Sequence, residues 1–197
     1  MGEIVLIRHG ETTWSASGRH TSVTDLELTA TGEAQARALA PLLRAWNFTA
    51  VWTSPRRRAV QTAELAGLPV TAVEEDLAEW AYGDYEGRTK EEIDELDPGW
   101  TIWTHGGKGP EGESAAQVEA RLDRALTGAK RLLDHGDVAF VAHGHTLRVA
   151  AARWLGRGAV DGRDFTIDTA SIAALGFEHG RQAISRWNLT AALADSA

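Results

Sequence analysis

The stretch Ile4-Val5-Leu6-Ile7-Arg8-His9-Gly10-Glu11-Thr12 predicts a strand that ends in a functional site. Four consecutive aliphatic residues with β-branched members are typical of a strand that is buried on both faces of a parallel sheet. The run stops at Arg8-His9-Gly10, at the carboxyl end of the strand, which is where ligands bind in open α/β sheets. Gly10 lacks a side chain, so a ligand can approach the backbone closely there. A solvated basic turn would account for Arg8 alone, but not for the pattern that recurs later in the chain.

A second aliphatic run, residues 138–142, ends in His143-Gly144-His145. Between the two runs, amphipathic helical stretches alternate with short apolar ones, and residues 171–177 and 182–187 have the pattern of a β-hairpin. This order predicts an α/β fold, a three-layer α/β/α sandwich whose sheet is mostly parallel with an antiparallel edge strand. The carboxyl ends of parallel strands meet at one rim of a sheet, so we expect His9 and His143 to lie close together.

The elements between these two strands follow from hydrophobic periodicity and from signals at helix ends. The sequence predicts strands over residues 50–53 and 69–73 and helices over residues 29–46, 56–66, 90–96, 114–135 and 146–155. Pro41 lies inside the first of these helices and predicts a kink or an earlier break. Ser54-Pro55 is typical of an N-cap followed by proline at the first helical position. Residues 13–28 are predicted as a partly ordered loop or short helix.

Length and composition fit one domain with a full hydrophobic core. The chain has 197 residues, of which 43% are hydrophobic, and it shows no repeat, linker or low-complexity run. We therefore predict a single domain over residues 1–197. Within it, residues 88–113 contain several glycines and tryptophans and are predicted as an irregular excursion that serves as a lid.

The charge of the chain and its lack of cysteine exclude several classes of function. A formal net charge of −8 argues against non-specific nucleic-acid binding, which broad basic surfaces mediate. No apolar run approaches the roughly 18–20 residues of a membrane helix, and the N-terminal stretch lacks the pattern of a signal peptide. The absence of cysteine excludes disulfides and thiolate ligands. We therefore expect a cytoplasmic protein with no membrane or nucleic-acid partner, which binds any anionic ligand through a local cluster of positive groups.

Arg56-Arg57-Arg58 place three cations in the first turn of a predicted helix. Cations are unfavourable there because the helix dipole is already positive at its N-terminus. Arg56 and Arg57 are predicted to be solvated or paired with an acid, whereas Arg58 shares a helix face with other polar residues and is predicted to point inward. With Arg8 it would suit a phosphoryl group, which favours guanidinium forks and backbone amides.

This set of side chains indicates phosphoryl-transfer chemistry. Histidine can act as a nitrogen nucleophile that forms a covalent intermediate and splits one difficult step into two. The leaving alkoxide needs a proton from an acid, and a glutamate shielded from solvent is suited to that task. Residues 77–87 are aromatic, acidic and interrupted by glycine, and are predicted to hold such a carboxylate.

Four blocks of the sequence resemble the histidine phosphatase superfamily, whose members have the phosphoglycerate mutase-like fold. The blocks come in the family's order and cover nearly the whole chain. Each alone is a weak signal, but together they are highly specific. They are Arg8-His9-Gly10-Glu11-Thr12, Thr53-Ser54-Pro55 with Arg58 to Ala63, Glu79 with Tyr82 to Gly87, and Val141 to His145.

The resemblance implies a role for each matching residue. His9 would become the phosphohistidine, its other ring nitrogen would donate to a backbone carbonyl, and Arg8 and Arg58 would lower its pKa. Glu79 would protonate the leaving oxygen and then deprotonate the attacking water. The implied catalytic residues are His9, Glu79, Arg8, Arg58 and His143, of which the last three would supply positive charge to the transferring phosphoryl group. The implied substrate- and phosphate-binding residues are Ser15, His20, Thr21, Tyr82, Gly144 and His145.

Departures from the mutase pattern favour hydrolysis. Glycolytic mutases usually carry asparagine after the tryptophan of the first block, whereas here Ser15 follows Trp14. Their glutamate-arginine-histidine-tyrosine block is here Glu79-Trp80-Ala81-Tyr82. The chain is also short for a mutase, which must exclude water from its phosphohistidine. The motifs instead resemble the acid phosphatase and sedoheptulose-bisphosphatase branch, which implies a small sugar phosphate as substrate.

Two alternatives remain open at this point. A cofactor-dependent phosphoglycerate mutase would use the same first step and respond to 2,3-bisphosphoglycerate. A non-catalytic protein-binding module would need a lost catalytic residue, and none is lost. No metal or other cofactor is expected, since the arginines beside His9 and His143 would repel a divalent cation. The expected partner is a small-molecule phosphate ester, and the C-terminal strands offer an edge for a homodimer.

Overall fold

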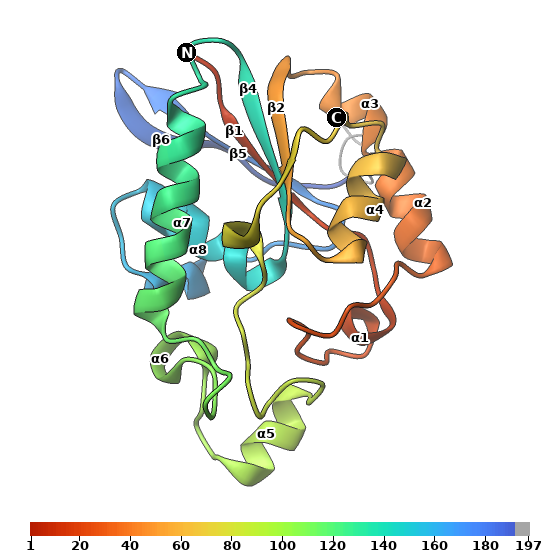
Figure 1. Cartoon of the computed structure of the whole chain (residues 1–197), viewed down its shortest axis with the longest axis vertical. Helices are drawn as coiled ribbons and strands as arrows, with labels where there is room; N and C mark the ends of the chain where they lie inside the picture. The colour runs from red at the N-terminus through yellow and green to blue at the C-terminus, as the bar shows by residue number, and fades with distance from the viewer. Residues whose placement is uncertain (192–197) are drawn as a thin grey trace.

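The computed structural model describes residues 1–191 and places a six-stranded sheet between two layers of helices (Figure 1). In spatial order the strands are β3 (Ala72–Val73), β2 (Phe48–Thr53), β4 (Asp137–Ala142), β1 (Ile4–Arg8), β5 (Ile172–Glu178) and β6 (Arg181–Leu189). Strands β1 to β4 are parallel to one another, and β5 runs antiparallel to both of its neighbours. The predicted sandwich, mostly parallel with an antiparallel edge, is therefore confirmed.

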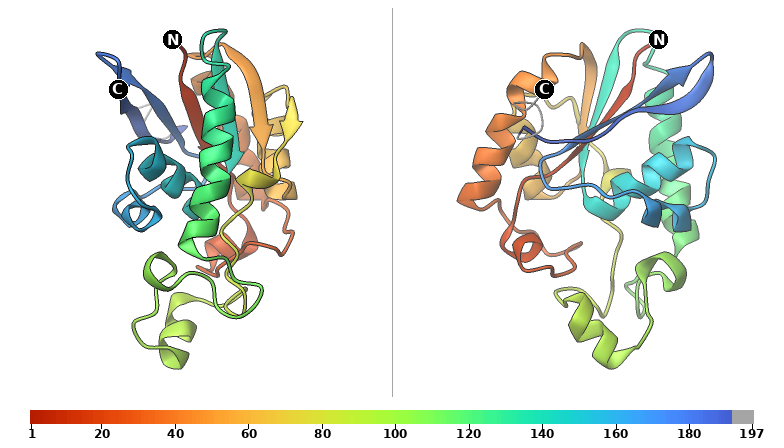
Figure 2. Two further views of the ribbon diagram at one scale, coloured as in Figure 1. Left: turned by 60° about the vertical axis from the view of Figure 1, so that its left-hand side comes forward. Right: turned by 180° about the vertical axis from the view of Figure 1, so that it is seen from behind.

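The helices cover both faces of this sheet. One face is covered by α2, α3 and α4 and the other by α7 and α8, as the two views in Figure 2 also show. The α-helices are α1 (Thr13–Ala16), α2 (Ala30–Ala38), α3 (Ala40–Leu43), α4 (Arg57–Leu65), α5 (Lys90–Leu96), α6 (Ile102–His105), α7 (Ala115–Lys130) and α8 (Gly144–Trp154). The 3-10 helices are η1 (Glu75–Leu77) and η2 (Ala159–Asp164).

Strand β1 lies at the centre of the fold because side chains on both of its faces are buried. Ile4 and Leu6 pack among residues of α7 and α8, while Val5 and Ile7 pack with residues of α3 and α4 on the opposite face. All four side chains are inaccessible to solvent. The uninterrupted aliphatic run therefore indicated correctly a strand buried on both sides.

Pro41 divides the helix that the sequence predicts over residues 29–46. Helix α2 ends at Ala38 and α3 starts at Ala40, because proline has no N–H to donate and its ring clashes with the preceding turn. The hydroxyl of Thr29 accepts the Gly32 N–H and caps the start of α2. The earlier break that Pro41 predicts is thus the arrangement observed.

Ser54-Pro55 does not start a helix, and this prediction was wrong. Helix α4 starts at Arg57, and Arg56 occupies the N-cap position without a side-chain cap bond. The Ser54 hydroxyl instead forms a 2.6 Å hydrogen bond with His143 Nε2. The same hydroxyl accepts the Arg56 N–H at 3.4 Å, so the short contact with a distant segment accompanies only a long local bond where a serine-proline pair favours a helix cap.

Two further helix boundaries differ from the prediction. Helix α7 ends at Lys130 rather than at residue 135, because residues 131–133 bond to carbonyls three positions earlier and form turns. Helix α8 starts at Gly144 rather than at residue 146, since the extended backbone of His143 (φ −126°, ψ 170°) is that of an N-cap residue. Strand β4 therefore passes almost directly into the helix that carries His145.

Residues 79–114 project beyond the carboxyl rim of the sheet and carry α5 and α6 (Figure 1). The two sides of this projection are joined by β-bridges between Tyr82 and Gly112 and between Gly83 and Lys108. Gly83 has a φ of 63°, and a Cβ there would collide with the Lys108 carbonyl oxygen, so glycine is required at this crossing. The predicted excursion is held by ordered contacts, and its function as a lid stays a prediction.

Candidate active site

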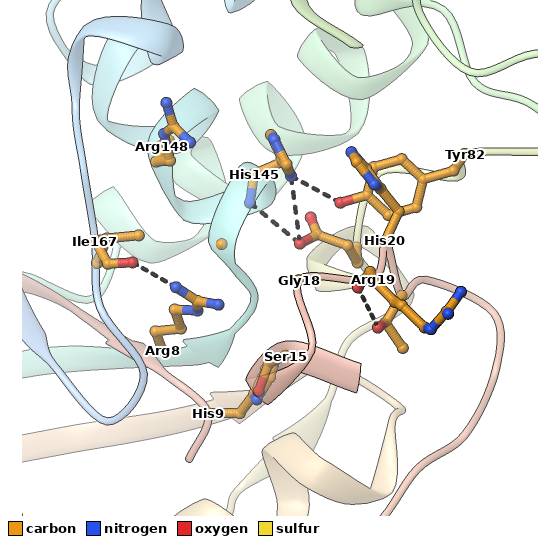
Figure 3. Close-up of a pocket in the computed structure, with 13 residues that line it drawn as sticks. Arg8, His9, Ser15, Gly18, Arg19, His20, Tyr82, His145, Arg148 and Ile167 are labelled. Atoms are coloured by element: carbon orange, nitrogen blue, oxygen red, sulfur yellow. Dashed lines mark hydrogen bonds and ion pairs between the residues drawn. The ribbon is translucent and has the colours of Figure 1, made fainter. Parts of the chain in front are cut away.

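The carboxyl rim of β1 and β4 carries a cavity of about 270 Å³ (Figure 3). Arg8 of β1 pairs with Ala142 of β4, so the residues that follow the two strands meet there. Nine of the eleven residues predicted for the site line the cavity, whereas Arg58 and His143 lie beside His9 without lining it. The lining residues are Arg8, His9, Ser15, Gly18, Arg19, His20, Thr21, Glu79, Tyr82, Gly144, His145, Arg148 and Ile167.

The two ring nitrogens of His9 have different environments. Its Nδ1 lies 2.7 Å from the Gly10 carbonyl oxygen. Since a carbonyl can only accept, Nδ1 carries the proton and Nε2 holds the lone pair. Burial, followed by the charges of Arg58 and Arg8, lowers the pKa of His9 well below its usual value. The neutral form of the ring, which a nucleophile requires, is therefore favoured at neutral pH.

Arg8 extends from the end of β1 to the start of α8. Its Nη1 donates to the Ile167 carbonyl at 2.6 Å, and its Nε is buried without a partner among the described residues. The guanidinium passes the backbone of Gly144, where a Cβ would lie 3.6 Å from Arg8 Cζ. A buried donor without an acceptor is costly, so this guanidinium is suited to an anionic ligand that supplies the missing acceptor.

Arg58 and His143 form a buried pair beside the nucleophile. The Arg58 Nε–H donates to His143 Nδ1 at 3.2 Å, so the proton of His143 is on Nε2, which donates to the Ser54 hydroxyl. The rings of His143 and His9 meet edge to face with centroids 5.1 Å apart. Burial and the charge of Arg58 lower the pKa of His143 well below its usual value. The neutral form of His143 is therefore favoured, and Arg58 is the permanent cation of this pair. The positive charge that the resemblance implied for both residues stays a prediction.

Glu79 is held at the N-terminus of α8. Its Oε1 accepts the N–H groups of Trp80 and Thr146 at 2.9 Å and the Thr146 hydroxyl at 3.0 Å. Its Oε2 accepts the His145 N–H at 3.1 Å. Glu79 is buried by these contacts and still lines the cavity. The hydrogen bonds therefore fix the carboxyl group in one orientation beside the space that a substrate would occupy.

An aromatic wall lines the substrate side of the cavity. His20 and His145 stack with ring centroids 6.3 Å apart, and Tyr82 meets both rings edge to face. The Tyr82 hydroxyl and His145 Nδ1 share a 2.7 Å hydrogen bond. Burial raises the pKa of Tyr82 well above its usual value and lowers the pKa of both histidines. This wall is therefore uncharged at neutral pH, and Trp103 continues it beyond His145.

The hydroxyls of Ser15 and Thr21 are engaged with nearby backbone. Ser15 Oγ donates to the Thr12 carbonyl at 3.1 Å and accepts the Thr12 N–H at 2.9 Å, within the capping box of α1. Thr21 Oγ1 donates to the Arg19 carbonyl at 3.0 Å. Both residues line the cavity, so the phosphate contacts that the resemblance implied would require these local bonds to be shared or exchanged.

Comparisons with known proteins agree with this site and fold. The family model of the histidine phosphatase superfamily (branch 1) matches residues 4–190. An acid phosphatase of Mycobacterium tuberculosis is 47% identical over 189 residues, which cover 95% of this chain and 92% of that protein. A sedoheptulose 1,7-bisphosphatase of Saccharomyces cerevisiae is 38% identical over 185 residues, which cover 78% of this chain and 68% of the yeast protein. The solved structure of open reading frame Rv3214 of Mycobacterium tuberculosis matches with a TM-score of 0.93 at 46% identity, over 96% of this chain and 98% of that one.

This chain belongs to the histidine phosphatase superfamily. The match runs from β1 to the end of β6, and it confirms the family that the four sequence blocks indicated. It also confirms the expectation of a phosphatase. The roles of the individual residues stay proposals.

Two arginines of this histidine phosphatase line the cavity although the sequence reasoning did not assign them to the site. Arg148 follows His145 by about one turn of α8 and lies over the Trp103 ring, 4.5 Å from its centroid. That spacing places it on the same helix face as His145, which was the available signal. Arg19 is held by Glu92, which lies 73 residues further along the chain. No local pattern distinguishes Arg19 from an ordinary surface arginine.

Thr62 links the turn that carries the nucleophile to α4. Its hydroxyl accepts the Gly10 N–H at 3.0 Å and donates to the Arg58 carbonyl at 2.6 Å. Thr62→Val keeps the shape but leaves the buried Gly10 N–H unpaired, so we expect the free energy of unfolding to fall by about 1–3 kcal/mol. Urea unfolding measures the loss, and Thr127→Val at an exposed position of α7 is the control. Equal midpoints for the wild type and Thr62→Val would show that this hydrogen bond adds nothing to stability.

Proposed function

We propose that this histidine phosphatase hydrolyses small phosphorylated metabolites, with sugar phosphates as the substrate class, through a phosphohistidine on His9. The observation that carries the proposal is the state of His9 in the cavity: Nδ1 is bound to the Gly10 carbonyl, and Nε2 is the unprotonated nitrogen of a neutral ring. The names of the acid phosphatase and sedoheptulose 1,7-bisphosphatase relatives support the reaction and the substrate class.

In the first step, the lone pair of His9 Nε2 forms the N–P bond while the P–O bond to the leaving group breaks. Arg8 and Arg58 supply positive charge beside His9, which stabilises the negative charge on the phosphoryl oxygens. Glu79 donates a proton to the leaving oxygen, so that an alcohol departs. In the second step, Glu79 removes a proton from water, the water oxygen attacks phosphorus, and the N–P bond breaks to release inorganic phosphate.

The environment of Trp80 favours hydrolysis over the mutase reaction. Trp80 stands where the mutase block carries arginine, but its side chain is fully buried and its indole N–H donates to the Glu113 carbonyl at 2.9 Å. Ala81 follows where the mutase block carries histidine and has no side-chain donor. These two positions therefore offer no group that would bind the carboxylate of a phosphoglycerate.

Phosphate release from a panel of esters tests the proposal. The panel contains sugar phosphates, p-nitrophenyl phosphate and 3-phosphoglycerate, assayed with EDTA from acidic to neutral pH. Release from one or a few sugar phosphates in the presence of EDTA would support a metal-independent phosphatase. Interconversion of 3- and 2-phosphoglycerate on addition of 2,3-bisphosphoglycerate, without phosphate release, would identify a mutase instead. Loss of all activity with EDTA would contradict metal independence, which stays a prediction until then.

Arg148 supports a preference for esters that carry a second anionic group. Its Nε and Nη2 donate to the carbonyls of Gly162 and Arg163 at 3.0 Å, and within residues 1–191 it forms no ion pair with an acid. A partly buried cation is ordinarily paired with an anion, since desolvation of a charge is costly. The yeast relative is named as a bisphosphatase, which fits a second anion at this end of the cavity.

We expect Arg148→Met to raise KM for a sugar bisphosphate by about tenfold or more, because hydrogen bonds to charged groups contribute about 1.5–3 kcal/mol. KM for p-nitrophenyl phosphate, which has no second anion, should change by less than about twofold on the same reasoning. Arg157→Met, at an exposed position beyond α8, is the matched control. If both esters lost affinity equally, Arg148 would not distinguish a second anion.

The remaining partners stay proposals. Within residues 1–191, strand β6 pairs only with β5 and leaves one open edge of the sheet. We propose a homodimer at this edge, and sedimentation velocity measures its formation. None of the helices within residues 1–191 is long and apolar enough to cross a membrane. The cytoplasmic location and the absence of a nucleic-acid partner remain predictions from composition.

A further inference from the structure

Arg58 binds the backbone of the segment 19–25. This segment contributes Arg19 and His20 to the cavity wall (Figure 3), and its Thr21 also lines the cavity. Arg58 Nη1 donates to the Thr24 carbonyl at 3.0 Å, and Nη2 donates to the carbonyls of Thr21 and Ser22 at 3.2 Å. With Nε bound to His143, the fork of this guanidinium is oriented by backbone carbonyls of one segment. The position of Arg58 beside His9 therefore depends on where those carbonyls lie.

Glu86 binds the same segment through its N–H groups. The Ser22 N–H donates to both carboxylate oxygens of Glu86, at 2.9 and 3.0 Å, and the Thr24 N–H donates to Oε1 at 3.0 Å. Among the described residues, Glu86 forms no ion pair. The Glu86 carboxylate thus binds the N–H donors of a short backbone segment, and the Arg58 guanidinium binds carbonyl acceptors of the same segment.

The residues that follow Glu86 fix it to the segment. The Gly87 N–H donates to the His20 carbonyl at 2.8 Å, and the His20 N–H donates to the Arg88 carbonyl at 2.9 Å. These backbone bonds hold the chain next to Glu86 against the segment, independently of the contacts of the Glu86 side chain. Glu86 itself does not line the cavity, so an effect of Glu86 on the reaction must pass through the segment and Arg58.

We propose that Glu86 is a positioning residue for Arg58: by holding the Ser22 and Thr24 N–H groups, it fixes the carbonyls that keep the Arg58 guanidinium beside His9. The consequence for catalysis rests on the proposed role of His9 as nucleophile. The consequence for geometry does not rest on that role, because it concerns only the distance between the Arg58 guanidinium and the His9 imidazole. The two can therefore be measured separately.

The pKa of His9, followed by NMR of labelled imidazole across pH, reports the position of Arg58 without any turnover. The charged and titratable groups around His9 are Arg58 on α4, Arg8 at the end of β1, His143 before α8 and Glu79 on the other side of the cavity. Among these groups, Arg58 is the one whose charge lowers the pKa of His9 most. Displacing Arg58 must therefore raise that pKa, because a nearby cation disfavours the protonated imidazole.

Three substitutions of Glu86 separate the effect of its side-chain length from the effect of its negative charge. Glu86→Ala removes both. Glu86→Asp keeps the charge but shortens the side chain, so its carboxylate no longer reaches both N–H groups. Glu86→Gln loses the charge but keeps an oxygen at the Oε1 position, which accepts from both Ser22 and Thr24. We expect the His9 pKa to rise in Glu86→Ala and Glu86→Asp and to stay unchanged or fall in Glu86→Gln, since loss of an anion alone disfavours imidazolium.

Activity should follow the same order. We expect kcat for phosphate release to fall by about 10- to 100-fold in Glu86→Ala and Glu86→Asp, the scale of loss for a catalytic group displaced by about 1 Å. The acid limb of kcat/KM should move to higher pH in these two variants only. Glu95→Gln is the matched control, since Glu95 lies on the same projection, at an exposed position of α5.

Each outcome decides something distinct. A raised His9 pKa in folded Glu86→Asp, with an unchanged or lower His9 pKa in Glu86→Gln, supports the proposal even if no ester is hydrolysed, in which case only the proposed function fails. An unchanged His9 pKa in Glu86→Asp, or a Glu86→Gln variant that behaves like Glu86→Ala, overturns it. Thermal unfolding of each variant identifies any that has lost its fold, and Glu86→Asp and Glu86→Gln, being the milder changes, then carry the comparison.

Discussion

Replacing His9 by alanine is expected to abolish phosphate release, with a loss on the order of 10⁵-fold or more, the scale seen when a hydrolase loses its covalent nucleophile. The imidazole is the group that forms the bond to phosphorus, and neutral His143 beside it has both ring nitrogens committed to Arg58 and Ser54. His143 therefore has no free ring nitrogen with which to take the place of His9. Steady-state release of phosphate from a sugar phosphate measures the effect.

Trapping the intermediate makes this test specific. The wild type, quenched in alkali during turnover of a labelled ester, should carry acid-labile label on His9, and His9→Ala should carry none. His135→Ala, at an exposed turn after α7, is the control and should retain activity and label. Circular dichroism and the unfolding temperature show whether His9→Ala keeps its fold. Label on another residue of a folded His9→Ala variant would rule out the proposed nucleophile.

Glu79→Gln is expected to slow the first step by about 10²- to 10⁴-fold for a sugar phosphate, because an alkoxide leaving group needs a proton in the transition state. The first step with p-nitrophenyl phosphate should be far less affected, since p-nitrophenolate leaves without a proton. The second step needs Glu79 as base for either ester. The variant should therefore release a burst of p-nitrophenol and then accumulate phosphohistidine.

Rapid-quench and stopped-flow measurements separate the two steps. Glu64→Gln, at an exposed position of α4, controls for the loss of one carboxylate. If the oxygen of a glutamine at position 79 keeps the contacts with Trp80 and Thr146, its NH2 group faces the His145 N–H, so the unfolding temperature should be measured as well. Equal losses in the first step for both esters would remove Glu79 from the role of acid.

The fold and the position of His9 at the rim of the sheet could be predicted from the sequence because adjacent residues determine them. An aliphatic run that ends in Arg8-His9-Gly10 sets both the buried strand and its functional rim, and the parallel pairing of β1 with β4 then brings His143 to the same rim. Pro41 acts equally locally, since its ring and missing N–H break a helix wherever it stands. In these places the local pattern and the tertiary structure agree.

The remainder of the site depends on contacts between distant segments, which no local period encodes. Ser54 has the local signature of a helix cap, but its hydroxyl is bound by His143, 89 residues later. The contact between Glu86 and Ser22 spans 64 residues, and nothing near either residue announces it. The neutral state of His143 likewise follows from burial beside Arg58. Such pairings become visible only once the packing is known.

Strand β1 lies in the middle of the sheet, yet its partners come far later in the chain. Ile4 pairs with Val138 of β4 and with Leu175 of β5, so the strand finds both neighbours only by closing very long loops. Loop closure costs entropy before any pairing offsets it, and folding slows as contacts become more distant in sequence. During synthesis on the ribosome, an aliphatic strand with two open edges is exposed until β4 and then β5 emerge, a state prone to aggregation and chaperone binding. The strand that carries His9 to the cavity is therefore also a place where folding of the nascent chain is vulnerable.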